Sequence, residues 1–130
     1  MNPLCMEEGI GIIPWSPLAR GFLAGNRTKC DQNPTVRARS DEFAHKLYYQ
    51  DSDFEVVDRL STIARQRGAT NAQVALAWVL QQPGVTSPIV GASKMQHLED
   101  AVKASEMTLK EEELKSLAEP YQPHRVLGHE

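Results

Sequence analysis

The sequence predicts an α/β fold with a parallel sheet, and three observations support this class. A continuous apolar run at residues 10–15 ends in a Ser-Pro turn, and a second apolar run at 86–90 ends at Gly91. Apolar runs that are bounded by turn signals are typical of parallel strands covered on both faces. The third observation is helical periodicity between and after the runs, which leaves room for a right-handed parallel crossover.

The first predicted elements are the end of a helix and a strand. Residues 1–8 have helical character without a start signal, and Gly9 is the predicted stop. Because the start signal is missing, we expect part of the fold to precede the chain. In the strand at 10–15, Pro14 is placed at the end, since proline donates no hydrogen bond to a sheet.

A long connection follows the first strand. Residues 22–51 show no steady hydrophobic period, and about 30 residues is far more than an ordinary connection. Ser40 is suited to cap a short helix within it. Two interpretations stay open: a solvent-exposed, mobile excursion, or a flap that brings Arg37 or Arg39 onto a ligand.

Two helices with recognisable start and stop signals come next. Residues 52–55 have capping-box spacing, and the helix that they open is predicted to end at Gly68. Its buried face is predicted to comprise Val56, Leu60, Ile63 and Ala64. Residues 70–73 repeat the spacing and open a helix at 72–80 that is apolar nearly all round, so we expect it to be buried on most sides.

The last two helices follow the second strand. Residues 93–96 again have capping-box spacing, with Ser93 as the cap. The buried stripe of this helix is predicted to be Leu98, Ala101 and Val102. The final helix starts at 108–111 and is predicted to turn Leu109, Leu114 and Leu117 inward. The tail that begins at Pro120 is irregular.

Composition and charge exclude several classes of protein. The 130 residues are 41% hydrophobic and 24% charged, ordinary values for one soluble domain spanning 1–130. A net charge of −3 gives no general attraction to nucleic acid or to anionic membranes. No apolar run approaches the roughly 20 residues that span a bilayer, and no signal peptide is recognisable. The four histidines lack metal-ligand spacing, so no metal site is predicted.

The cysteine content favours a reducing compartment. Cys5 and Cys30 permit one disulfide, but they lie far apart in the sequence. Free thiols in a reducing cytosol are the expected state, so the predicted location is cytoplasmic.

Residues that suit an anionic ligand follow the two predicted strands. Ser93 and Lys94 stand at a helix start, where free N–H groups and the positive end of the helix dipole favour a phosphate. Ser93 is equally suited to act as a simple N-cap. Trp15 is suited either to a core position or to stacking on an aromatic ligand. No pairing of side chains specifies a catalytic constellation, so no catalytic residue is assigned.

Two motifs at the ends of the predicted strands resemble those of a known family. The stretch GIIPWSPLARG from Gly11 to Gly21, and the stretch PIVGASK from Pro88 to Lys94 with HLEDAV shortly after it, are similar to the carboxyl-terminal part of an aldo-keto reductase. The ending PYQPH is similar to that of bacterial members associated with deoxyxylulose phosphate and thiamine metabolism. The resemblance covers essentially the whole chain.

The resemblance implies a partial (β/α)8 TIM barrel, with 10–15 and 86–91 as its seventh and eighth strands. A complete barrel runs to about 250 residues, roughly twice this chain. It also implies NADPH bound at the carboxyl ends of those strands. The implied contacts are Trp15 with the nicotinamide, Ser16, Pro17, Leu18 and Gly21 with the pyrophosphate, and Gly91, Ser93 and Lys94 with the 2′-phosphate. His97 is implied near that phosphate, Asp100 near the adenine and Arg37 near the cofactor.

The family's catalytic Asp, Tyr, Lys and His belong to the amino-terminal half of the barrel, and no part of this chain matches them. The resemblance therefore implies NADPH-dependent reduction of small-molecule carbonyl substrates, with this chain carrying only the cofactor-binding part. An alternative of a different class is an inactive half-barrel that self-associates or binds NADPH. A third possibility is a segment of a longer gene product.

Overall fold

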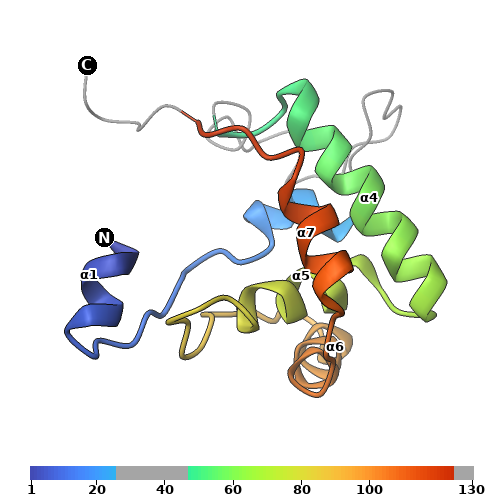
Figure 1. Ribbon diagram of the computed structural model, residues 1–130. Coiled ribbons are helices and arrows are strands. Elements are labelled where there is room, and N and C mark those ends of the chain that lie inside the picture. The colour runs from blue at the N-terminus through green and yellow to red at the C-terminus, as the bar shows by residue number, and fades with distance from the viewer. Residues whose placement is uncertain (26–46, 125–130) are drawn as a thin grey trace.

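Helices dominate the computed structural model, which describes residues 1–25 and 47–124. In chain order they are α1 (Asn2–Glu7), the 3₁₀ helix η1 (Ala19–Ala24), α4 (Asp51–Arg67), α5 (Asn71–Leu80), α6 (Met95–Ser105) and α7 (Glu111–Ala118). Figure 1 shows α1 apart from the other helices and joined to them by an extended segment. Most of the predicted long connection, including Arg37, Arg39 and Ser40, lies outside the described residues.

The two predicted strands do not form regular strands within residues 1–25 and 47–124. What remains of the pairing is two isolated bridges, Ile12 with Val85 and Trp15 with Ile89. Both bridges are parallel, as predicted. The extended barrel strands that the sequence suggested are therefore reduced to two contact points.

Proline explains why this pairing is short. Thr86 N–H donates to the carbonyl of Ile12 at 2.8 Å, so Pro88 occupies the next donor position on the same edge. Because Pro88 has no N–H, Ile89 N–H donates to the carbonyl of Pro14 instead, at 2.9 Å. The register thus advances by one residue between the two bridges, and a continuous ladder cannot form.

Two glycines shape the segment that leads into the first bridge. Gly9 has φ +66° and follows α1, and the N–H groups of Gly9 and Ile10 donate to carbonyls in the last turn of that helix. This confirms Gly9 as the helix stop. A Cβ on Gly11 would lie 2.3 Å from Oγ1 of Thr86, so the close approach of the two runs requires a glycine there.

Helix α4 begins slightly earlier than predicted. Its N-cap is Gln50, whose N–H donates to Oδ2 of Asp53 at 2.9 Å, and Gly68 ends it with φ +62°. The predicted start at Ser52 was therefore wrong, because the carboxylate of Asp53 reaches back to Gln50 instead. The buried apolar residues are Val57, Leu60, Ile63 and Ala64, with Val56 only half-buried.

Helix α5 confirms both its predicted cap and its predicted burial. Thr70 Oγ1 accepts the N–H of Gln73 at 3.2 Å, and Gln73 Oε1 accepts the N–H of Thr70 at 3.1 Å. The helix contacts α4, α6 and η1, so its apolar surface is covered from several sides. The core comprises Leu60, Ile63, Ala64, Val74, Ala75, Ala77, Leu109 and Leu117.

Helix α6 buries a different face from the predicted one. Asp100 and Ala104 are its buried residues, whereas Leu98 and Val102 are 51% and 55% exposed. Gln73 Nε2 donates to Oδ1 of Asp100 at 2.8 Å, and this buried hydrogen bond fixes which face of α6 meets α5. The predicted stripe was therefore wrong, and two of its large side chains face outward.

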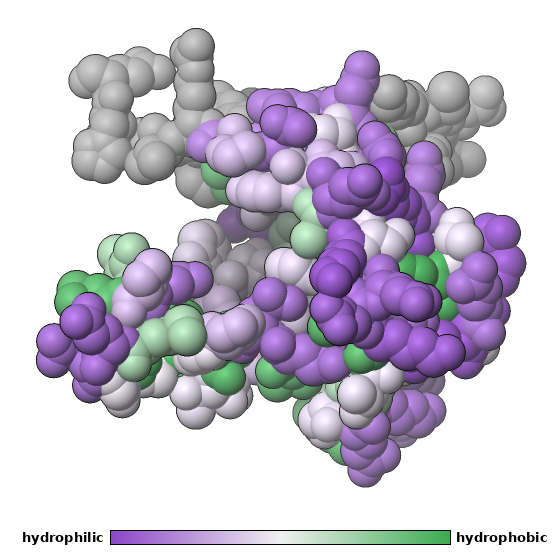
Figure 2. Space-filling model, in the orientation of Figure 1, coloured by the Kyte–Doolittle hydropathy of each residue, from purple (hydrophilic) through white to green (hydrophobic). Residues whose placement is uncertain are grey.

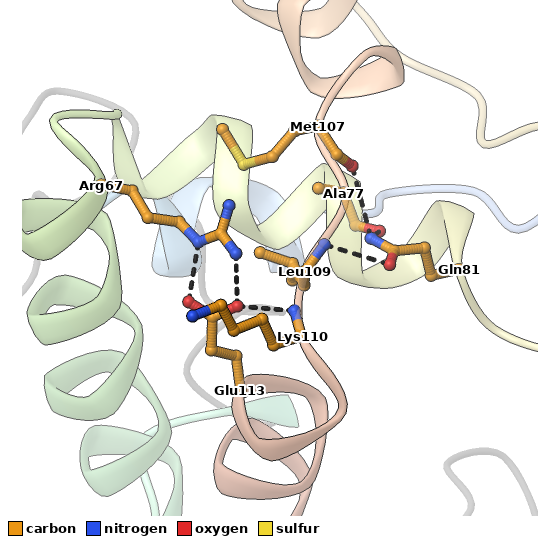
Figure 3. Close-up of polar contacts among 7 residues, drawn as sticks. All are labelled: Arg67, Ala77, Gln81, Met107, Leu109, Lys110 and Glu113. Atoms are coloured by element: carbon orange, nitrogen blue, oxygen red, sulfur yellow. Dashed lines mark hydrogen bonds and ion pairs between the residues drawn. The ribbon is translucent and has the colours of Figure 1, made fainter.

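Helix α7 begins at Glu111, the last residue of the stretch 108–111 that was predicted to start it. Its N-cap is Lys110, whose N–H donates to Oε2 of Glu113 at 2.6 Å, and the same carboxylate accepts two hydrogen bonds from Arg67 of α4. Leu109 and Leu117 are buried as predicted, at 3% and 6% exposure. Figure 3 shows that Glu113 ties the start of α7 to the end of α4.

Gln81 performs a similar function at the end of α5. Its Nε2 donates to the carbonyls of Ala77 at 2.9 Å and Met107 at 3.4 Å, while its Oε1 accepts the N–H of Leu109 at 3.1 Å (Figure 3). One side chain thereby satisfies backbone groups of α5 and of the connection between α6 and α7. The helices α4, α5, α6 and α7, called the helical layer below, are therefore held together by polar contacts as well as by the core.

The surface differs between the helical layer and the bridged segments. Figure 2 shows a largely hydrophilic face over α4 and α7 and more hydrophobic residues around α1. Large side chains that are more than half exposed include Leu4, Ile10, Ile13, Trp15, Ile89 and Leu98. Within residues 1–25 and 47–124, no helix is both long and apolar enough to cross a membrane.

Candidate functional site

The bridge between Trp15 and Ile89 brings the two sequence motifs to one edge. Because the pairing is parallel, the segments that follow both residues leave the bridge in the same direction. Ser16 starts one of these segments, and Val90 and Gly91 start the other. In parallel α/β folds, ligands bind outside the carboxyl ends of strands, so this edge is the candidate site.

The segment after Trp15 has an unusual backbone. Ser16, Ala19 and Arg20 have φ of +53°, +48° and +56°, a region that side-chain-bearing residues seldom occupy, and Gly21 follows at +91°. Ser16 supports this turn, since its carbonyl accepts the N–H of Ala19 at 2.9 Å and its Oγ accepts the N–H of Arg20 at 3.2 Å. Strained backbone of this kind concentrates at ligand sites.

The side chains of this first segment differ in exposure. Trp15 is 66% exposed, so it does not take the core position that was one of its two predicted interpretations. Ser16, Pro17, Leu18 and Gly21 are half-buried. Leu18 packs against the core, and its carbonyl accepts the N–H of Gly21 at 2.9 Å.

The second segment carries the exposed basic residue. Gly91, Ser93, Lys94 and His97 are all exposed. Lys94, not Ser93, is the N-cap of α6, and no side chain caps this helix. Ser93 Oγ instead lies 3.5 Å from Nδ1 of His97, so its predicted capping role was wrong. The first turn of α6 contains no acidic residue of its own to face the positive end of the helix dipole.

Asp100 lies apart from the exposed residues of this segment. Its side chain is 9% exposed and accepts hydrogen bonds from Gln73 Nε2 at 2.8 Å and from Gln96 Nε2 at 3.2 Å. The structure therefore places Asp100 at the interface between α5 and α6. Arg37 lies outside the described residues, so nothing is added to its predicted role.

A cleft that the sequence did not predict lies between η1, α4, α5 and α7. Its volume is about 410 Å³, and its wall is mostly apolar and aromatic. Asp53 and His124 form the polar part of the wall, with Nε2 of His124 2.9 Å from Oδ1 of Asp53. These two residues are 71 positions apart, so no local signal in the sequence could pair them.

Ion pairs between helices shift the pKa values of several charged groups. Hydrogen bonds from Arg67 lower the pKa of Glu113 and, reciprocally, raise that of Arg67. Hydrogen bonds with Glu119 and Glu55 raise the pKa of Arg59. These pairs join α4 to α7 and to the residues after it, so they stabilise the helical layer. Among the described residues, no three His, Cys, Asp or Glu side chains gather where they could hold a metal ion.

The described residues are mostly helical and pair in parallel at two isolated bridges, and parallel pairing between helices is a feature of α/β proteins. The model of the Aldo/keto reductase family matches residues 1–122, and the chain belongs to this family. A relative from Aspergillus parasiticus, versiconal hemiacetal acetate reductase, is 36% identical over 135 residues, covering 97% of this chain and 36% of its own length. The chain thus spans about a third of the length of such relatives.

Two solved structures resemble the chain. A thermostable aldo-keto reductase in complex with the inhibitor epalrestat is 27% identical with a TM-score of 0.62, covering 92% of this chain and 32% of its own. A glycerol dehydrogenase from Gluconobacter oxydans shares the fold, with 21% identity, a TM-score of 0.69, and coverage of 92% and 36%. These neighbours are TIM barrels, whereas in this chain the described residues pair only at the two bridges.

Proposed function

We propose that this chain is the cofactor-binding segment of an NADPH-dependent carbonyl reductase. Membership of the aldo-keto reductase family supports the reaction class, and the relative from Aspergillus parasiticus is named a reductase. The single observation that carries the proposal is the parallel bridge between Trp15 and Ile89. This bridge directs both motif segments toward one edge, where one extended nucleotide could touch them together.

The first segment would hold the nicotinamide and the pyrophosphate. The exposed ring of Trp15 offers a flat apolar surface on which a nicotinamide can stack. The half-buried turn that contains Ser16, Pro17, Leu18 and Gly21 would wrap the pyrophosphate. The positive φ angles within this turn change the course of the backbone after Trp15.

The second segment would hold the 2′-phosphate of NADPH. Lys94 supplies a full positive charge at the start of α6, where the helix dipole also favours an anion. Ser93, His97 and the backbone at Gly91 are exposed beside it. Asp100 is better suited to orienting α6 than to contacting adenine, because two amide groups already occupy its carboxylate. Arg37 belongs to the proposed set on the family resemblance alone.

The chemistry of the proposed site divides between the chain and the cofactor. Bound NADPH would supply hydride to a small-molecule carbonyl substrate. The residues of this chain would bind and orient the nucleotide, and the family resemblance assigns the proton donor to the half of the barrel that this chain does not match. Activity of the chain by itself is therefore not expected.

The substitution Lys94→Ala tests the proposed phosphate contact. We expect the Kd for NADPH to rise about tenfold while the Kd for NADH changes less than about twofold, because only NADPH carries the 2′-phosphate. Quenching of tryptophan fluorescence during titration measures both constants. The control is Lys103→Ala, which removes a charge from the last turn of the same helix. Equal losses for both nucleotides, or no binding by the unmodified chain, would contradict the proposal.

A second candidate function is a catalytically inactive module that self-associates. Exposed Ile10, Ile13 and Ile89 near the open edges of the bridged pair favour it, because large exposed apolar patches seldom persist on monomers. Sedimentation velocity over a range of concentrations should then show dimers or larger species. A monomer at every concentration would rule this candidate out.

A further inference from the structure

We propose that the cleft between η1, α4, α5 and α7 binds a neutral aromatic small molecule with one hydroxyl group. The proposal rests on the shape and chemistry of this cleft, independently of nucleotide binding. Trp15 and Lys94 do not line it. Pro17 does, so the cleft begins behind the turn that follows the bridge between Trp15 and Ile89.

The size and the wall of the cleft define the class of ligand. Its volume of about 410 Å³ lies in the range of small-molecule sites. Phe22, Tyr48, Trp78 and Tyr121 contribute aromatic rings to the wall. Apolar walls with ring surfaces favour flat, uncharged ligands, because a charged group would lose its hydration without compensation.

An ionisable pair, Asp53 and His124, interrupts this wall. Asp53 is 7% exposed, and its carboxylate accepts hydrogen bonds from Nε2 of His124 at 2.9 Å and from the N–H of Gln50 at 2.9 Å. A carboxylate has room for about four acceptor contacts, so two partners leave acceptor capacity at the cleft. A hydroxyl on the ligand can donate to it, and charge-assisted bonds of this kind are strong. The ligand therefore needs one donor placed at the edge of an aromatic body.

The surrounding helices hold the cleft in shape. Trp78 Nε1 donates to the carbonyl of Leu114 at 3.2 Å, which fixes the indole of α5 against α7. Leu60, Ala75 and Leu117 belong both to the core and to the wall. A ligand would thus meet a largely pre-formed surface, which lowers the entropic cost of binding.

The test uses 2-naphthol as the probe and 2-methylnaphthalene as its hydroxyl-free match. The ¹⁵N-labelled chain is titrated with each compound while the indole N–H signals of Trp78 and Trp15 are followed. Trp78 lines the cleft, whereas Trp15 lies outside it and serves as an internal control. We expect a saturable shift of the Trp78 signal and a Kd roughly tenfold lower for the naphthol. A shift of the Trp15 signal alone, or equal affinity for the two compounds, would overturn the proposal.

Two substitutions place the ligand in the cleft. Ala75→Leu fills it from the buried side, and Ala118→Leu fills it from the exposed end of α7, where misfolding is not a concern. Each should raise the Kd for 2-naphthol at least tenfold. The control Ala72→Leu adds the same volume to α5 outside the wall and should leave binding unchanged. Unchanged binding in both cleft variants, or displacement of 2-naphthol by NADPH, would refute a separate site.

Discussion

The helical layer and the bridged edge, which is the pair of segments joined at Ile12–Val85 and Trp15–Ile89, differ in how far their apolar side chains are buried and their backbone groups are hydrogen-bonded. In the layer, α5 has a reciprocal capping box and its apolar surface is covered. The side chains of Gln81 and Glu113 accept the backbone N–H groups of Leu109 and Lys110 just before α7. At the edge, two parallel bridges leave Ile13 and Trp15 61% and 66% exposed. The layer is completed by contacts within the described residues, several of them between positions far apart in the sequence, whereas at the edge large apolar side chains stay exposed.

Helix α6 stands between these two regions and shows what the difference means. It packs on α5 through Asp100 and Ala104, while Leu98 and Val102 face outward. The face of α6 that meets α5 thus buries a carboxylate whose hydrogen bonds are satisfied by Gln73 and Gln96, while the predicted apolar stripe stays exposed.

The largest expected effect comes from removing a core side chain of the layer. Leu60 is 2% exposed, and Leu60→Ala should lower the free energy of unfolding by about 3 kcal/mol, since it leaves a cavity. The matched substitution Leu98→Ala, at a 51% exposed position, should cost less than about 0.5 kcal/mol. Urea denaturation measures both. Equal losses would mean that α6 buries its stripe in solution.

A smaller and pH-dependent effect is expected from the ion pair between α4 and α7. Arg67 holds the pKa of Glu113 below its ordinary value, and Nε of Arg67 lies 2.7 Å from Oε1 of Glu113. Because the folded pKa is the lower one, this contribution is present above the unfolded pKa and is lost as the pH falls through the folded pKa. Glu113→Gln should therefore cost about 1–2 kcal/mol near pH 7, and the difference should shrink as the pH falls below the ordinary glutamate pKa of about 4.3 and be lost below the lowered folded pKa.

A neighbouring residue supplies the control for this prediction. Glu111 also pairs with a cation, but its side chain is 79% exposed, so Glu111→Gln should have almost no effect at any pH. Urea titrations at several pH values compare the two variants. A loss for Glu113→Gln that does not depend on pH would contradict the electrostatic explanation.

Helix starts and stops were predictable where one local pattern decides them. Gly9 and Gly68 end helices as predicted, and Thr70 with Gln73 forms the predicted capping box. Capping failed at Ser52 and Ser93, because a serine at the right spacing competes with neighbours that the sequence does not rank. Asp53 takes the N–H of Gln50, and Ser93 lies beside His97.

The strands and the candidate site were predictable to different extents. Parallel direction followed from the spacing of the two apolar runs, but their shortness depends on Pro88, whose effect on register appears only in pairing. Trp15 and Lys94 are both exposed, and the cofactor contacts that their motifs suggested stay predictions. The cleft was not predictable, because Asp53 and His124 meet only through the packing of the carboxyl-terminal tail on α4.

Pro88 also sets the length of chain between the bridge at Trp15 and the charge of Lys94 in the proposed site. In an unbroken register set by Ile12 and Val85, Trp15 would stand opposite Pro88, six positions before Lys94. The slipped register places Trp15 opposite Ile89. The chain from the partner of Trp15 to Lys94 is thereby one residue shorter, which is about 3.3 Å of extended chain. The distance between the Trp15 ring and the Lys94 charge therefore depends on the N–H that Pro88 lacks. A residue with an N–H at position 88 would restore the unbroken register and lengthen the chain between the two groups by one residue.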